Sequence, residues 1–151
     1  MIREQLLEFH TKKLLAAAGW FPGRQQKEML EDWIISFFNL QEFSLTEAAR
    51  DALLELGGLR VEQSGAGESV ARGSFWFEPT GAWGEYDRFL EFEKFLSSNI
   101  CPIGEADNGA SFLAITEDGR VLCLMDDAWI IGSNLENALN SLAYGRLGKA
   151  I

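Results

Sequence analysis

Carboxylates are the side chains of this sequence with the greatest capacity for chemistry. Glu105, Asp107, Asp126 and Asp127 fall in segments that the sequence marks as turns, and paired carboxylates can support hydrolysis or bind a metal ion. Acidic residues also form turns, because their side chains hydrogen-bond the local backbone. We therefore favour a turn-forming role for these acids over a glycosidase-like or metal-dependent site.

Other catalytic groups are scarce. The chain has one histidine, His10, and two cysteines, Cys101 and Cys123. His10 lies on an apolar helical face without a nucleophile or carboxylate cluster beside it, which predicts a hydrogen-bonded core or boundary residue. Each cysteine stands in an apolar context without metal-ligand spacing, which predicts buried free thiols and leaves a disulfide between them open. We predict no catalytic residue, metal or cofactor, and no enzymatic activity.

The glycines at 65 and 67 have a spacing that phosphate-binding loops also use. No lysine follows them, no third glycine is correctly spaced, and no helix begins after them. We therefore predict that residues 64–69 form a flexible hairpin connection.

The charge balance points to the kind of partner. There are 23 acidic and 13 basic residues, which gives a net charge of -10. Such a surface repels nucleic acid and anionic lipid and attracts a basic partner, although acidity can also serve solubility alone. No apolar run approaches membrane-spanning length, and the chain opens with a charged helical pattern where an export signal would be apolar. These features predict a cytoplasmic protein without nucleic-acid or membrane partners.

The elements that must position these side chains begin with a hairpin. Residues 111–116 and 120–126 are apolar runs joined by a turn that contains Asp118-Gly119, which predicts a type I′ turn with two positive-φ residues. Residues 129–131 form a third run. Neither face of the hairpin is clearly polar, so we expect both to be covered, at least partly by helices.

A second pair of strands is predicted at residues 59–63 and 74–78. Helical patterns cover residues 2–18, 25–38, 84–97 and two further segments, one starting from a capping box of Ser44 and Glu47 and one capped by Ser133 or Asn134. In segment 84–97 the apolar face is wide, so its aromatics are either internal or partly exposed as a contact surface. The 151 residues suit one domain, 1–151, with an α+β fold: a mostly antiparallel sheet of about five to six strands with flanking helices.

Several segments, in order, resemble a known family. They are residues 19–24 (GWFPGR), 56–61 (LGGLRV), 101–105 (CPIGE), 113–121 (LAITEDGRV), and 129–132 (WIIG) with 138–142 (ALNSL). Together they are similar to the third subgroup of the SUKH superfamily across nearly the whole chain. One departure is Leu122, where the family often carries an aromatic residue.

The resemblance implies a SUKH-like α+β protein that acts as an immunity protein in bacterial polymorphic toxin systems. Such a protein binds a cognate toxin domain, often a nuclease, and blocks it. Acidity suits that role, because a nuclease presents a basic cleft for phosphates. Superfamily relatives include yeast cell-wall regulators and a bacterial translocase-interacting protein, so a non-catalytic intracellular scaffold or regulator is the alternative.

The family carries no catalytic residues over to this chain. For the partner contact we predict loop acids and nearby aromatics: Glu68, Glu78, Trp83, Glu105, Asp107, Asp126, Asp127 and Trp129. Exposed tryptophans anchor interfaces, but each of these two could instead belong to the core. Either a monomer or a homodimer fits the sequence.

Overall fold

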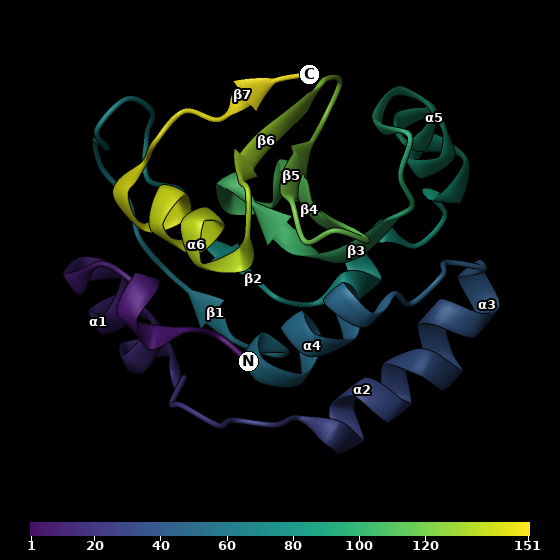
Figure 1. The fold of residues 1–151 in the computed structure, drawn as a ribbon, viewed down its shortest axis with the longest axis horizontal. Coiled ribbons are helices and arrows are strands. Elements are labelled where there is room, and N and C mark those ends of the chain that lie inside the picture. The colour runs from purple at the N-terminus through teal and green to yellow at the C-terminus, as the bar shows by residue number, and fades with distance from the viewer.

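An antiparallel sheet of seven strands forms the centre of the structure. A computed structural model describes all residues from Met1 to Ile151. The strands lie side by side in chain order (Figure 1). They are β1 (Arg60–Val61), β2 (Phe75–Trp76), β3 (Ile100–Ala106), β4 (Ser111–Thr116), β5 (Val121–Leu124), β6 (Ala128–Gly132) and β7 (Lys149–Ala150). The predicted α+β class is confirmed, with seven strands where about five to six were expected.

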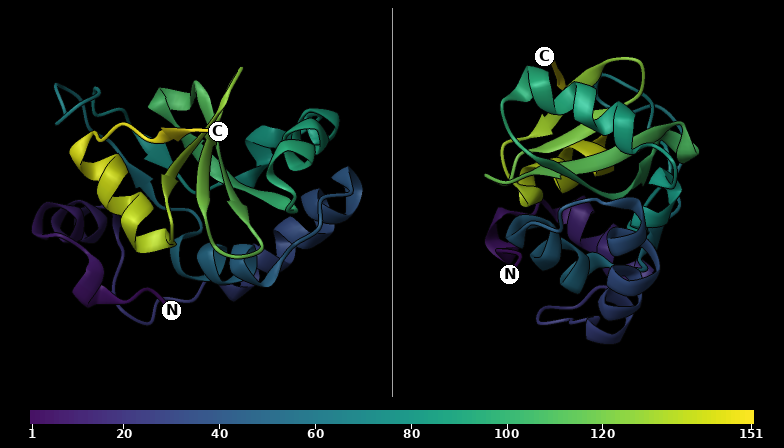
Figure 2. Two further views of the ribbon diagram at one scale, coloured as in Figure 1. Left: turned by 45° about the horizontal axis from the view of Figure 1, so that its top comes forward. Right: turned by 90° about the vertical axis from the view of Figure 1, so that its right-hand side faces the viewer.

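Helices lie on both sides of this sheet. They are α1 (Phe9–Ala18), α2 (Lys27–Trp33), α3 (Asn39–Gln41), α4 (Glu47–Leu56), α5 (Tyr86–Leu96) and α6 (Leu135–Tyr144). Short 3₁₀ turns are η1 (Glu4–Leu6), η3 (Pro79–Ala82) and η4 (Asp107–Gly109). Figure 2 shows α5 on one side of the sheet and α2 and α4 on the other. The expectation that helices cover both faces is thus confirmed.

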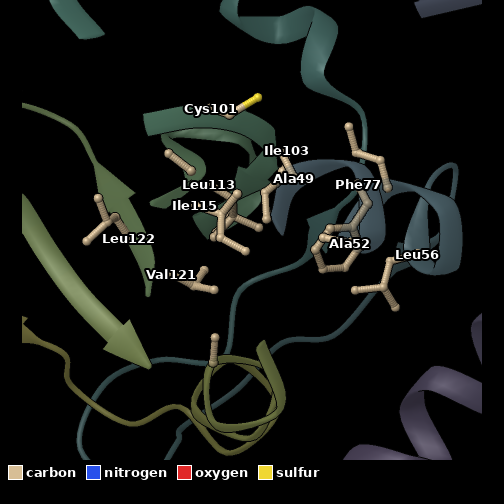
Figure 3. Close-up of a cluster of buried hydrophobic side chains, with 14 of the residues drawn as sticks. Ala49, Ala52, Leu56, Phe77, Cys101, Ile103, Leu113, Ile115, Val121 and Leu122 are labelled. Carbon is tan, nitrogen blue, oxygen red and sulfur yellow. The ribbon is translucent and has the colours of Figure 1, made fainter. Parts of the chain in front are cut away.

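Alternation along the central strands sends side chains to both helical layers. Leu113 and Ile115 of β4 point toward Ala49 and Ala52 of α4 in a buried cluster (Figure 3). Phe112 lies on the opposite face, where its ring centroid is 5.7 Å from that of Phe89 on α5. The strands are therefore apolar on both faces, which explains why neither face reads as polar in the sequence.

The β4–β5 turn differs from the predicted type I′ turn. Gly119, with φ 90°, is its only residue with positive φ. The N–H of Gly119 donates to the Thr116 carbonyl at 3.0 Å, and the Thr116 N–H donates to the Arg120 carbonyl at 2.9 Å. A tight turn followed by one left-handed glycine gives a three-residue loop with a bulge. Asp118 keeps a negative φ, and its carboxylate accepts a hydrogen bond from Arg120 Nε at 3.0 Å.

Strand β3 is the main element that the sequence did not predict. It contains Pro102 and Gly104, which normally argue against a strand interior. The register between β3 and β4 shifts between these two residues, so a bulge accommodates the proline. A Cβ at Gly104 would lie 2.0 Å from the Trp76 carbonyl oxygen, so the glycine allows β2 to approach closely.

Two helix starts differ from their predictions. Thr46, and not Ser44, caps α4, because its hydroxyl accepts from the Ala49 N–H at 3.2 Å. The predicted helix 2–18 is interrupted before α1, where the Glu8 N–H donates to Asn140 Oδ1 at 2.9 Å. Tertiary contact with α6 therefore takes the place of one helical hydrogen bond. The cap of α6 is Asn134, one of the two predicted candidates.

The second helix, predicted at residues 25–38, begins at Lys27 and ends at Gln41. α2 runs through a π-helical turn at Ile34–Phe38 directly into α3. Phe37 and Phe38 are fully buried, whereas Ile35 and Leu40 are exposed. The helix therefore buries its aromatic stripe and also carries apolar side chains to the surface at its C-terminal end.

Candidate partner-binding surfaces

The structure divides the eight predicted contact residues between two places. The first, which we call the pocket surface, comprises Asp107 and Trp129, which line a pocket of about 190 Å³, and three acids next to lining residues: Glu68, which bonds to Arg146, and Asp126 and Asp127, which follow Met125. The second, which we call the Trp83 surface, comprises Glu78 and Trp83 at the two ends of η3 and Glu105, which lies against Gly81 of η3. We add Leu40, because the adjacent Gln41 accepts a hydrogen bond from Gly84. The sequence offered no means of separating these groups, because they are brought together by the topology.

The pocket opens on the sheet face that carries Ser111, Cys123 and Trp129. Cys123 and Trp129 are paired across β5 and β6 and share that face. Asp107 and Trp129 line the pocket directly. The remaining lining residues come from the segment 70–73, from the β5–β6 hairpin, from the end of α6 and from the segment that follows it: Val70, Ala71, Gly73, Met125, Ile131, Ser141, Leu142, Gly145, Arg146, Leu147 and Gly148. The pocket is thus mostly apolar, with a few polar groups among its lining residues.

Arg146 neutralises part of the pocket surface. Its guanidinium donates to the Glu8 carboxylate at 2.5 and 2.9 Å and to Glu68 at 2.7 Å, and it lies 4.6 Å from the Tyr144 ring centroid. The hydrogen bonds from Arg146 lower the pKa of both carboxyls. Of the predicted acids at this place, Glu68 is therefore already engaged within the chain.

The other acids at the pocket have local partners, with one exception. Asp126 pairs with Arg88 at 3.7 Å. Asp107 accepts a hydrogen bond from the Ser111 hydroxyl at 2.9 Å. Asp127 is exposed, and no side chain pairs with it. Glu68 and Asp126 therefore have a cationic partner within the chain, whereas Asp107 and Asp127 do not.

The glycine-containing loop between β1 and β2 forms one wall of the pocket. It connects two antiparallel strands, as predicted. A Cβ at Gly67 would lie 2.1 Å from the Val70 carbonyl oxygen and 2.6 Å from Gly145 Cα. The N–H groups of residues 69 and 70 both donate to the Gly145 carbonyl at 2.9 Å. The glycine spacing thus serves close contact with the end of α6, and these N–H groups are not free to bind an anion.

The Trp83 surface has an exposed aromatic side chain on a rigid support. Trp83 is 56% exposed, and its ring centroid lies 6.3 Å from that of the buried Phe37. The adjacent Gly84 N–H donates to Gln41 Oε1 at 2.7 Å, which fixes η3 to α3. Leu40 is 63% exposed and follows Phe37 by one helical turn.

Glu105 is the least satisfied carboxylate of this surface. It is half-buried, and its Oε1 would lie 1.6 Å from a Cβ built on Gly81. No protein group donates a hydrogen bond to it. Burial raises the pKa of the Glu105 carboxyl, the nearby Glu78 raises it further, and Arg60 lowers it. Glu78 follows by two residues the Trp76 that pairs with Glu105 in the sheet, so the two carboxylates are held on neighbouring segments beside η3.

Two residues of these candidate surfaces could not be found from the sequence. Arg146 pairs with acids 138 and 78 residues away, a distance at which no local pattern operates. Leu40 lies beyond the π-helical turn, which moves it out of the buried stripe. The one usable signal was the acidity of the surrounding loops.

The histidine and the two cysteines lie in surroundings that indicate a structural role. His10 is half-buried between Tyr144 and Arg72, with 3.3 Å between His10 Nε2 and an Arg72 nitrogen, as expected for a boundary residue. Cys101 and Cys123 are buried free thiols, as predicted, and burial raises the pKa of each to about 12. No group of three or more acidic, histidine or cysteine side chains could hold a metal ion. None of the helices has the length and apolar character needed to cross a membrane.

Comparison with known families identifies the class of protein. A family model matches residues 7–145, almost the whole chain, and places it among the immunity proteins of the SUKH superfamily. In particular, the chain belongs to the SUKH-3 immunity protein family, as the ordered sequence segments suggested. No curated protein and no solved structure matches it significantly.

Proposed function

We propose that this protein binds a cognate toxin domain, such as a nuclease, and neutralises it through a protein–protein interface. Membership of the SUKH-3 immunity protein family carries the proposal. In this role the protein needs no catalytic group, because covering or distorting the active site of the toxin is sufficient.

The charge distribution supports a basic partner. The chain carries a net charge of -10. A nuclease concentrates positive charge where it binds phosphates, so the two proteins would attract each other over several ångströms and associate faster than neutral partners. The same charge disfavours direct binding of the inhibitor to the nucleic acid.

We also propose that the protein acts in the cytoplasm, where the toxin would meet its target. The two buried thiols are free, which suits a reducing compartment. Neutralisation inside the producing or receiving cell would then need no export of the inhibitor.

Co-expression tests the proposal. The gene next to this one is examined for a secreted protein with a C-terminal toxin domain, and that domain is induced in cells with and without this protein. We expect growth to be restored and the two proteins to co-purify. A matched control is Leu53→Asp, because Leu53 is fully buried and a buried unpaired charge prevents folding. Equal killing with and without the wild-type protein would contradict the proposal, as would purification with a housekeeping protein in place of the toxin.

A further inference from the structure

We propose that the partner docks on the Trp83 surface, inserting a lysine or arginine beside Glu78 and Glu105 and packing a loop against Trp83. This inference rests on the proposed function, because the partner is the toxin domain. It goes further by naming the surface and the chemistry that the partner must present.

The apolar part of this surface is exposed to solvent and packed on buried aromatic side chains. Trp83 and Leu40 expose 56% and 63% of their surfaces. Trp83 lies against Phe37, which stacks on Phe43 at 5.6 Å, and Phe43 packs edge-on against Tyr86 at 5.6 Å. A tryptophan held over a rigid aromatic cluster loses little conformational freedom on binding, and tryptophans are enriched among the residues that dominate interface energies.

The polar part of the surface lacks a cation. Glu105 receives no hydrogen bond and lies against Gly81 of η3, and Glu78 follows by two residues the Trp76 that pairs with Glu105, which adds a like charge on the neighbouring segment. Arg60 is on the strand next to Trp76, but its guanidinium lies 4.0 Å from the Trp76 ring centroid and pairs with Glu62 at 3.4 Å. An ammonium or guanidinium group from a partner would supply the missing donors and remove the repulsion between the two acids.

The surface also has a suitable position in the fold. α3 and the start of α5 lie at the same end of the molecule, away from α1 and α6 (Figure 1). The hydrogen bond between Gly84 and Gln41 and the aromatic contacts hold this end together. A partner would therefore meet a surface that needs little rearrangement.

Isothermal titration of the purified toxin domain into purified variants tests the inference. We expect Trp83→Ala to weaken binding at least about 30-fold, as for a central interface residue. Glu105→Gln should weaken it about tenfold and Glu78→Gln about threefold, because the first carboxylate is less exposed to solvent. Raising the salt concentration should weaken the wild-type complex more than the complexes of the two glutamine variants.

Two matched controls lie elsewhere on the surface. Phe9 is an exposed aromatic residue, and Glu4 is an exposed acid without an ion-pair partner. Phe9→Ala and Glu4→Gln should bind within about twofold of the wild type, the range of a peripheral surface change. Circular dichroism and thermal melts establish that every variant is folded; Glu105→Gln should be at least as stable as the wild type.

The outcomes separate this inference from the proposed function. If the wild type binds the toxin and Trp83→Ala and Glu105→Gln bind equally well, the docking surface is wrong while neutralisation stands. If Asp127→Asn and Trp129→Ala weaken binding instead, the pocket surface is the interface. If the wild type does not bind, both proposals fail.

Discussion

The pocket surface and the Trp83 surface both combine acids with a tryptophan, but the chain treats their charges differently. At the pocket, Arg146 holds Glu68 and Glu8, and Arg88 pairs with Asp126. Beside η3, Glu78 and Glu105 have no such arginine. An acid that is paired within its own chain contributes to structure, whereas an unpaired acid retains its attraction for a partner. Net charge alone would not distinguish the two places.

Hydrophobic exposure gives the same contrast. Trp129 is half-buried in the wall of the pocket, whereas Trp83 stands largely in solvent. The pocket surface is therefore built mainly from contacts inside the molecule. The Trp83 surface leaves apolar area whose burial would strengthen a complex.

The largest effect is expected from Phe37→Ala, which removes the support of Trp83. Phe37 is completely buried and contacts Phe38, Phe43 and Trp83. We expect the free energy of unfolding to fall by about 3–5 kcal/mol, because the truncation leaves a cavity. Denaturation in urea measures the change. A loss below about 1 kcal/mol would mean that the aromatic cluster is looser than the structure shows.

The next effect concerns the wall of the pocket. Gly67→Ala places a Cβ 2.1 Å from a backbone carbonyl, and a backbone atom cannot move aside as a side chain can. We expect a loss of about 1–3 kcal/mol in urea denaturation. Toxin binding measured on the folded fraction should be unchanged; a strong loss of affinity would favour the pocket surface as the interface.

Gly81→Ala is the matched change at the other surface. The atoms nearest to its Cβ would all belong to the Glu105 side chain, with Oε1 at 1.6 Å, Cδ at 2.7 Å and Cγ at 3.3 Å. The carboxylate can rotate away, so stability should change far less than in Gly67→Ala. Binding of the toxin should nevertheless weaken, because the displaced carboxylate no longer meets the incoming cation.

A smaller effect is expected from Glu8→Gln, and it should depend on pH. The Arg146 hydrogen bond lowers the pKa of Glu8 below its ordinary value of 4.5. The ionised carboxylate therefore stabilises the folded state above that value, and the contribution disappears as the pH falls through the folded-state pKa. We expect a loss of about 0.5 kcal/mol at pH 7, reduced by solvent screening. Urea denaturation at several pH values should show that the loss vanishes in acid. A loss that is the same at every pH would mean that the ion pair between Glu8 and Arg146 makes no electrostatic contribution to stability.

The smallest effect, with the opposite sign, is expected from Glu105→Gln. Burial and Glu78 raise the pKa of Glu105, so the ionised form disfavours folding at neutral pH. The protonated Glu105 carboxyl therefore makes its full contribution to the stability of the wild type below the unfolded-state pKa. This contribution is lost as the pH rises through the folded-state pKa. The variant should gain up to about 0.5 kcal/mol at pH 7, and the gain should shrink in acid. A destabilised variant would show that Glu105 already has a structural partner.

Local patterns in the sequence predicted the elements whose hydrogen bonds and apolar spacing are local. The β4–β5 hairpin and the α6 cap at Asn134 are examples. Strand β3 was missed because Pro102 and Gly104 normally interrupt strands, and their tolerance depends on a bulge and on the neighbouring Trp76 backbone. The type of turn at Gly119 was predicted wrongly, because the same residues can form two hairpin geometries.

The candidate sites were less predictable than the fold. The sequence indicated acidic loops and two tryptophans, but exposure of Trp83 and enclosure of Trp129 depend on packing by distant segments. The ion pair that neutralises Glu68 also joins it to Arg146, a residue far away in the chain. Charge composition therefore suggested the kind of partner, and only the three-dimensional arrangement showed where unpaired charge remains.

Mapping the partner on the labelled protein tests the central claim most directly. Amide resonances of the uniformly ¹⁵N-labelled wild type are followed while the unlabelled toxin domain is added. We expect the largest changes at residues 40–42, 78–85 and 105, around Trp83 and Glu105. Changes confined to residues 67–72, 125–131 and 145–148, around the pocket, or no changes at all, would contradict the claim that unpaired acids beside an exposed tryptophan receive the partner.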